Sequence, residues 1–368
     1  MDKKNDAATS KPLIRTGTTR RRFLAGTAMA GAGLAVSGPL IIVPGKAKAA
    51  ERIVFVSYGG TTQEIQERVF IKPFMKETGI EVISASGPDA AKIKAMVQTK
   101  NVEWDLVNLT GAMATGLEDD GLLEPLDKSR FDAADMLFPD WLRQASLGWY
   151  YYTGGIAYDP KRHPAGKHPR DWKQLWDVKA FPGRRGLRTR PEENLEMALM
   201  ADGVAAKDVY PINIDRAFKA LDRIKPHVPV WIKETPKTVT MIQTNEVDFT
   251  FTYSGRVTQA QDQGVSIDFV YETPLSSPSL MGIPKGTKNR DAAMKLLAYF
   301  MRPDRQLEYV DAIDGYSPAS KKAYAMMADV KKKKLPDPAN PSALMADIDW
   351  WGKNFIDTNK RFQEWLLT

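Results

Sequence analysis

Short apolar runs alternate with segments of helical periodicity over residues 53–110, and this alternation constrains the fold more than any other feature. Three runs rich in β-branched side chains predict buried strands, and the two stretches between them predict helices. The strands are expected at residues 53–56, 80–83 and 105–109, and the helices at 65–79 and 90–99, with Pro73 interrupting the first helix. This βαβαβ order predicts a parallel sheet that binds ligands beyond the carboxyl ends of its strands.

A second α/β unit is predicted further along the chain. Its strands are expected at 150–158, 186–189 and 247–252, and its helices at 171–176, 192–201 and 239–244, with two later helices at 291–301 and 348–367. Pro274, Pro278 and Pro284 indicate a stiff crossing segment, and residues 331–334 a polar loop. About 319 residues follow position 49, more than a single core usually organises, so we expect two lobes.

Residues 1–49 have the three parts of an export signal. Arg20, Arg21 and Arg22 precede an apolar, uncharged run at 24–44, and the alanine-rich end KAKAA follows at 46–50. The paired arginines before Phe23 resemble the twin-arginine type, which implies export to the periplasm. No second apolar run of about 18 residues follows, so we expect that the mature protein does not span a membrane.

The charge balance argues against a nucleic-acid partner. Taking the nine basic and two acidic residues of 1–49 from the totals of 52 and 45 leaves 43 of each, so the mature chain is neutral. Nucleic-acid affinity rests on clustered positive charge, which a neutral chain does not indicate. The chain contains no cysteine, which excludes disulfides, thiolate metal sites and a cysteine nucleophile.

Five segments in order resemble the extracellular solute-binding proteins of ABC transporters, of the spermidine/putrescine-binding type. They are FMKETGIEV at 74–82, DLV at 105–107, GLLEPLD at 121–127, WKQLW at 172–176 and IPKGTKN at 283–289. The resemblance implies a type 2 periplasmic binding protein, with two Rossmann-like α/β lobes joined by crossing strands and a ligand cleft between them. Lobe 1 is expected at 50–152 plus 280–315, and lobe 2 at 153–279 plus 316–368. The resemblance further implies a monomer without catalytic residues, cofactor or metal. Such a protein delivers a small molecule to a membrane permease.

The ligand contacts depart from those of polyamine binders, in which carboxylates hold ammonium groups and aromatic rings box the alkyl chain. Aligned by the flanking motifs, Arg190 replaces a cleft aspartate, and Ser279 and Ser277 replace a second aspartate and its neighbouring tryptophan. Ala112 replaces a boxing tyrosine. An arginine reverses the charge that the site tolerates, so Arg190 and Arg256 predict an organic anion or zwitterion as the ligand.

Other candidate contacts follow from the same resemblance. Glu193 matches a family glutamate, and it either takes the ammonium of an amino-acid-like ligand or holds an arginine in place. The remaining expected ligand contacts are Tyr58, Gly59, Gly60, Thr110, Tyr253, Tyr316 and Trp351. The glycines and Thr110 are expected to supply N–H and hydroxyl donors to the oxygens of an anion.

Three alternatives stay open at this point. A polyamine binder of the same family is the first, and a ferric-ion binder that uses the tyrosine run at 150–152 is the second. His163, His168 and His227 lie in positions that do not favour a metal site. An enzyme on this scaffold is the third and the least favoured, because the chain has no cysteine, no Gly-x-Ser-x-Gly elbow and no phosphate loop.

Overall fold

The computed structural model describes residues 51–335 and 340–368, and the predicted export signal lies outside them. The strands are β1 (Arg52–Ser57), β2 (Glu81–Ser86), β3 (Leu106–Thr110), β4 (Ser146–Tyr158), β5 (Arg185–Arg188), β6 (Val230–Ile232), β7 (Phe249–Tyr253), β8 (Asp268–Phe269), β9 (Leu275–Gly282), β10 (Tyr316–Pro318) and β11 (Leu344–Met345). The helices are α1 (Gly60–Gln66), α2 (Lys72–Thr78), α3 (Ala90–Gln98), α4 (Gly111–Asp119), α5 (Trp172–Trp176), α6 (Asn194–Ala201), α7 (Ile214–Ile224), α8 (Thr235–Gln243), α9 (Ser254–Asp262), α10 (Arg290–Phe300), α11 (Pro303–Ala312), α12 (Lys321–Met326), α13 (Asp329–Lys332) and α14 (Ile348–Leu367).

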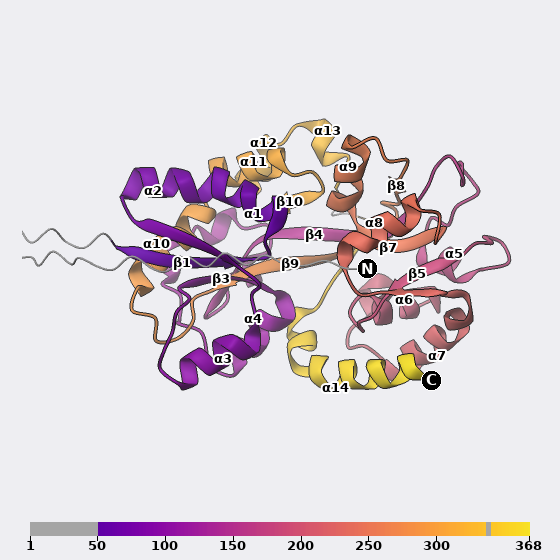
Figure 1. The fold of residues 1–368 in the computed structure, drawn as a ribbon, viewed down its shortest axis with the longest axis horizontal. Helices are drawn as coiled ribbons and strands as arrows, with labels where there is room; N and C mark the ends of the chain where they lie inside the picture. The colour runs from indigo at the N-terminus through magenta and orange to yellow at the C-terminus, as the bar shows by residue number, and fades with distance from the viewer. Residues whose placement is uncertain (1–50, 336–339) are drawn as a thin grey trace, which may run out of the picture. The chain divides into compact units, whose positions relative to one another are not determined.

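One continuous sheet runs through the described residues in the order β2-β1-β3-β9-β4-β7-β5-β6. At one end β1 pairs in parallel with β2 and β3, and at the other β5 pairs in parallel with β6 and β7. Between these ends, β9 and β4 pair antiparallel with each other and with their neighbours. Figure 1 shows the two strands lying side by side between the two groups of elements. The expected crossing segment is therefore a pair of long strands.

The buried side chains form separate cores on either side of the crossing strands. We name residues 51–152 with 280–335 lobe 1, and residues 153–279 with 340–368 lobe 2. Phe70, Trp149 and Phe300 pack in lobe 1, and Trp172 and Phe251 pack in lobe 2. The lobe boundaries expected from the sequence stay a prediction. They assign residues 316–335 to lobe 2, whereas Ala319, Met327 and Leu335 pack with the core of lobe 1.

The first helix differs from its prediction at its start and around Pro73. It begins at Gly60, five residues earlier than expected, because the turn at Gly59 leads directly into α1. A π-helical turn at Glu67–Ile71 joins α1 to α2, so Pro73 falls in the first turn of a new helical segment. A proline is tolerated there because it lacks the N–H that such a position leaves unbonded. The segment ends at Gly79, whose φ of 71° is the left-handed conformation of a helix C-terminus.

The two helices α4 and α14 cross at very close range and link lobe 1 to lobe 2. Thr115 Oγ1 in α4 donates a hydrogen bond of 2.9 Å to the carbonyl of Ile348 in α14. A Cβ added at Gly352 would lie 2.1 Å from Thr115 Oγ1, so only glycine fits there. The rest of α14 lies on lobe 2, where Phe362 is buried with Phe218 in one core.

Gly352→Ala is therefore expected to lower the free energy of unfolding by about 1–3 kcal/mol, through overpacking against Thr115. Urea unfolding followed by circular dichroism measures this change. The matched control is Gly116→Ala in α4, where the nearest atom to an added Cβ lies 4.0 Å away. The control should stabilise the protein by up to about 1 kcal/mol, because alanine is the better helix former. Equal effects of the two substitutions would contradict the close-packing interpretation.

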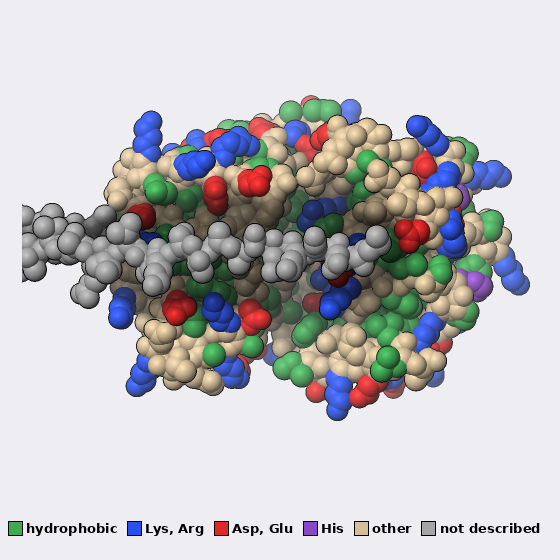
Figure 2. All heavy atoms as spheres, viewed as in Figure 1, with side chains coloured by type: hydrophobic (Ala, Val, Ile, Leu, Met, Phe, Trp, Pro, Cys, Tyr) green, Lys and Arg blue, Asp and Glu red, His purple; other side chains and the backbone are tan. Residues whose placement is uncertain are grey.

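The surface of the described residues carries charges of both signs. Figure 2 shows basic and acidic side chains interspersed on the face that it presents, without one dominant basic patch. This arrangement agrees with the neutral charge balance of the chain beyond residue 49. Among residues 51–335 and 340–368, no helix combines the length and the apolar character needed to cross a membrane.

Candidate ligand-binding site

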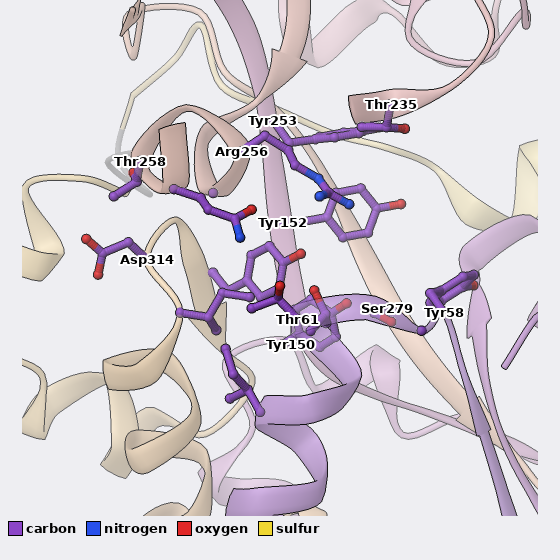
Figure 3. A pocket seen from close by; sticks show the side chains of 18 of the residues that line it. Tyr58, Thr61, Tyr150, Tyr152, Thr235, Tyr253, Arg256, Thr258, Ser279 and Asp314 are labelled. Atoms are coloured by element: carbon purple, nitrogen blue, oxygen red, sulfur yellow. The ribbon is translucent and has the colours of Figure 1, made fainter. Parts of the chain in front are cut away.

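A cavity of about 380 Å³ lies between the ends of elements from both lobes. Lobe 1 contributes the turn after β1, the first turn of α1, the end of β3 and the loop before β10. Lobe 2 contributes Thr235 at the start of α8, the end of β7 and one side of α9. Figure 3 shows tyrosine, threonine and arginine side chains around this cavity. The position agrees with the prediction that ligands bind beyond the carboxyl ends of the strands.

The glycine turn after β1 shapes the lobe 1 wall. Gly59 has φ 74° and ψ −175°, a conformation that is essentially restricted to glycine. Its N–H donates a hydrogen bond of 2.9 Å to Gln63 Oε1, so it is already used within the protein. Thr110 Oγ1 likewise accepts a bond of 3.3 Å from Met113 N as the cap of α4. Gly60, Thr61 and Thr62 line the cavity next to this turn, and Tyr58 is half-exposed at its edge.

Tyrosine rings form much of the cavity wall. Because side chains alternate along β4, Tyr150 and Tyr152 line the cavity, whereas Tyr151 packs on the other side against Phe138. Tyr316 from β10 stacks on Tyr150 with ring centroids 4.9 Å apart. Burial raises the pKa of Tyr150 well above its ordinary value, so its hydroxyl stays protonated. The three consecutive tyrosines therefore do not converge on one point.

Arg190 lines the cavity, but a carboxylate already neutralises it. Its Nε and Nη2 atoms donate to the two oxygens of Glu193 at 2.9 and 2.5 Å, and Nη2 also contacts the Tyr253 hydroxyl. The Glu193 side chain is 5% exposed and that of Arg190 is 34% exposed. Although burial opposes the charged guanidinium, Glu193 holds the pKa of Arg190 well above its usual range. Both oxygens of Glu193 thus accept hydrogen bonds from Arg190, as expected if this carboxylate holds an arginine in place.

Arg256 is the cation of this cavity that lacks a carboxylate partner. It belongs to the first turn of α9, and its side chain is exposed along the cavity wall. Within residues 51–335 and 340–368, the guanidinium makes no hydrogen bond or ion pair. The helix N-terminus adds partial positive charge at the same place, which favours an anion there. Arg190 has a carboxylate partner and Arg256 has none, so the two predicted arginines differ in the charge that they offer to a ligand.

Two carboxylates also line the cavity, and only one of them is neutralised. Asp314 forms ion pairs with Lys331 and Lys334, which hold the pKa of that carboxyl below its usual value against the effect of burial. The polar loop predicted at 331–334 is wrong in part, because Asp329–Lys332 form the short helix α13. Asp262 at the end of α9 is exposed and has no ion pair among the described residues.

A smaller hollow of about 40 Å³ adjoins the main cavity, since Thr110, Tyr152 and Arg190 line both. It collects the remaining predicted contacts, which are Glu193, Ser277 and Trp351, together with Ala112. Glu192 and Glu196 also line it, and sequence reasoning named neither. Burial raises the pKa of Glu196 to about 7, and it does the same for Glu192 although Arg190 acts in the opposite direction.

The predicted site residues therefore fall into two adjoining groups. The main cavity brings together Tyr58, Gly59, Gly60, Thr110, Arg190, Tyr253, Arg256, Ser279 and Tyr316. Sequence reasoning missed Tyr150 and Tyr152 as ligand contacts, although the alternation of side chains along a strand was an available signal, and it missed Thr235, Thr258 and Asp262, which had none. In the described part of the chain, no group of three or more His, Cys, Asp or Glu residues is arranged to hold a metal ion.

The family described as bacterial extracellular solute-binding protein matches residues 70–338. The chain is a bacterial extracellular solute-binding protein. Its family confirms the expected fold of two α/β lobes with a ligand cleft, and its role as the substrate-binding component of an ABC importer. Such a component works in the periplasm, binds a small molecule and passes it to the permease of the transporter.

Three proteins that are similar to this solute-binding protein are named for the small molecules that they bind. A gamma-aminobutyric acid-binding protein of Pseudomonas aeruginosa is 31% identical over 86% of this chain and 91% of its own length. The solved structure of the Atu4243–GABA receptor has a TM-score of 0.79 at 34% identity, covering 86% of this chain and 98% of that one. A spermidine/putrescine-binding periplasmic protein of Escherichia coli is 25% identical over 76% of this chain and 80% of its own length.

Proposed function

We propose that this solute-binding protein captures a small zwitterion or organic anion of the γ-aminobutyrate class and delivers it unchanged to an ABC permease. The observation that carries the proposal is the unpaired Arg256 in a cavity whose other arginine is neutralised by Glu193. A guanidinium offers paired donors that match the two oxygens of a carboxylate. The relatives named for gamma-aminobutyric acid support the same class.

The proposal also covers the export, the oligomeric state and the activity of the protein. Residues 1–49 direct twin-arginine export, and the mature chain acts as a monomer. It has no enzymatic activity, in keeping with a family of binding proteins. The export route rests on the sequence pattern of residues 1–49 described above, and the monomer rests on the resemblance to solute-binding proteins.

A polyamine is a weaker candidate, despite the distant spermidine/putrescine-binding relatives. A diammonium ligand in the main cavity would face Arg256, which repels it, and would need carboxylates at both of its ends. A ferric ion is weaker again, because Tyr151 lies on the opposite face of β4 from Tyr150 and Tyr152. Neither rival has a set of contacts in the main cavity that matches its charge.

A thermal-shift panel tests the proposal directly. We expect γ-aminobutyrate to raise the melting temperature and putrescine, spermidine and ferric citrate to leave it unchanged. A ligand present at 100 times its Kd stabilises the folded state by about 2.7 kcal/mol, which is readily measured. Stabilisation by putrescine without any effect of γ-aminobutyrate or other small carboxylates would overturn the proposal in favour of a polyamine binder.

A further inference from the structure

The small hollow beside the main cavity is lined by more acidic than basic side chains. Glu192, Glu193 and Glu196 line it, and Arg190 is the basic residue among its lining side chains. Arg190 is bonded to Glu193 and lies 4.0 Å from a carboxylate oxygen of Glu192. Glu196 has no ion pair among the described residues. The hollow is therefore lined by three acidic side chains and one basic side chain, next to a cavity that offers a free cation at Arg256.

Glu196 is fully buried, and one of its two oxygens is unsatisfied. Oε1 accepts hydrogen bonds from the Tyr210 hydroxyl at 2.6 Å and from Trp351 Nε1 at 2.7 Å. Oε2 has no hydrogen-bond partner within the described part of the chain. Leaving a buried carboxylate oxygen without a donor costs free energy, and a donor that enters the hollow would remove that cost.

We propose that this hollow is the subsite for the ammonium group of the ligand, with Glu196 Oε2 as its acceptor and Glu192 as a second carboxylate beside it. The inference rests on the proposed function, because the same ligand places its carboxylate against Arg256 in the main cavity. The hollow of about 40 Å³ fits a small group and not a whole ligand, since a cavity that binds benzene measures about 150 Å³. The division of charge between hollow and cavity selects a zwitterion over a simple organic anion.

Asp262 is the competing acceptor for the ammonium group. It lines the main cavity and has no ion pair among the described residues, but its side chain is exposed to solvent. Attraction between exposed charges is weak, because water solvates both partners. Glu196 is buried, so a charge-assisted bond to it is sheltered and stronger. An Asp262→Asn variant separates these two acceptors.

The same subsite makes binding depend on pH. Glu196 faces Tyr210, Trp351 and Glu193, with its pKa raised to about 7 by burial. The pKa of Glu192, which lies between Arg190 and Glu193, is also raised to about 7 by burial. Protonation removes the negative charge that holds an ammonium group, so affinity for γ-aminobutyrate rises between pH 6 and pH 8. The ionised fraction of a group of pKa 7 rises about tenfold over that range.

The experiment compares γ-aminobutyrate with butyrate, which lacks the ammonium group, by titration calorimetry at pH 6 and pH 8. We expect Glu196→Gln to weaken γ-aminobutyrate binding about tenfold, to leave butyrate binding unchanged and to flatten the pH dependence. Glu192→Gln is expected to act in the same direction with a smaller effect. Asp262→Asn should keep the preference for γ-aminobutyrate over butyrate, and the control Glu364→Gln, on an exposed part of α14, should match the wild type.

The possible outcomes are distinguishable. Wild-type affinities that are equal for the two ligands, or a Glu196→Gln variant that keeps the preference for γ-aminobutyrate, overturn the subsite and leave the proposed function standing. Loss of that preference in Asp262→Asn alone moves the ammonium site to the main cavity. A wild type that binds neither ligand overturns the proposed function and the subsite together. If Glu196→Gln does not fold by circular dichroism, the wild-type pH series and Glu192→Gln decide the question.

Discussion

Arg256→Ala is expected to raise the Kd for γ-aminobutyrate about ten- to a hundredfold, because it removes the unpaired guanidinium of the cavity. A hydrogen bond to a charged group contributes about 1.5–3 kcal/mol, and each 1.4 kcal/mol corresponds to a tenfold change; because Arg256 is exposed, the lower end of this range is expected. The residue makes no hydrogen bond or ion pair among the described residues, so its loss leaves no protein group unsatisfied. Stability should therefore stay close to that of the wild type.

Titration calorimetry with γ-aminobutyrate and butyrate measures this effect, and both ligands should lose affinity because both carry the carboxylate. The matched control is Arg68→Ala, an exposed arginine on lobe 1 that lies outside the cavity lining. Arg256→Lys should recover part of the affinity, since an ammonium keeps the charge without the paired donors. Unchanged affinity in Arg256→Ala would discard the anion-binding role of this residue.

Arg190→Met is expected to act first on folding, lowering the free energy of unfolding by about 2–4 kcal/mol. The substitution leaves the Glu193 carboxylate buried at 5% exposure without its partner. Breaking a fully buried pair costs about 3–5 kcal/mol, and the 34% exposure of the Arg190 side chain places the expected loss at the lower end. Urea unfolding in the absence of ligand measures it.

A double-mutant cycle with Glu193→Gln tests the pairing itself. We expect the double variant to be more stable than Arg190→Met alone, because the uncompensated charge is gone. Arg216→Ala is the control, since its ion pair with Asp202 is exposed and contributes at most about 1 kcal/mol. An Arg190→Met variant as stable as the wild type would show that Glu193 does not depend on this arginine.

Much of the fold was predictable because its signals are local. The βαβαβ unit followed from short β-branched runs between amphipathic segments, and the observed β1, α3 and β3 lie within one or two residues of those predictions. The last helix begins at Ile348 and ends at Leu367 as predicted, after a capping aspartate at position 347. The helix around Pro73 was less predictable, because a π turn moves the proline into a tolerated position.

The candidate site was only partly predictable, because its pairings join distant residues. The sequence pattern selected Arg190, Arg256 and Glu193, but not which arginine is neutralised. The structure pairs Arg190 with Glu193, whose backbone has a φ of 64° that no sequence pattern predicts. The hollow was not predictable at all, since Glu196 meets Trp351 across 155 sequence positions. Neither residue carries a local signal for that contact.

The contact between Trp351 and Glu196 has a practical consequence for observing ligand capture. Indole emission depends on the polarity and charge around the ring, and this indole donates to the carboxylate proposed to receive the ammonium group. Trp351 also lies in the first turn of α14, beside the crossing that links the lobes. The protein thus holds a native fluorophore where the arrival of an ammonium group would be read without any attached dye, and Trp351→Phe identifies its share of the signal.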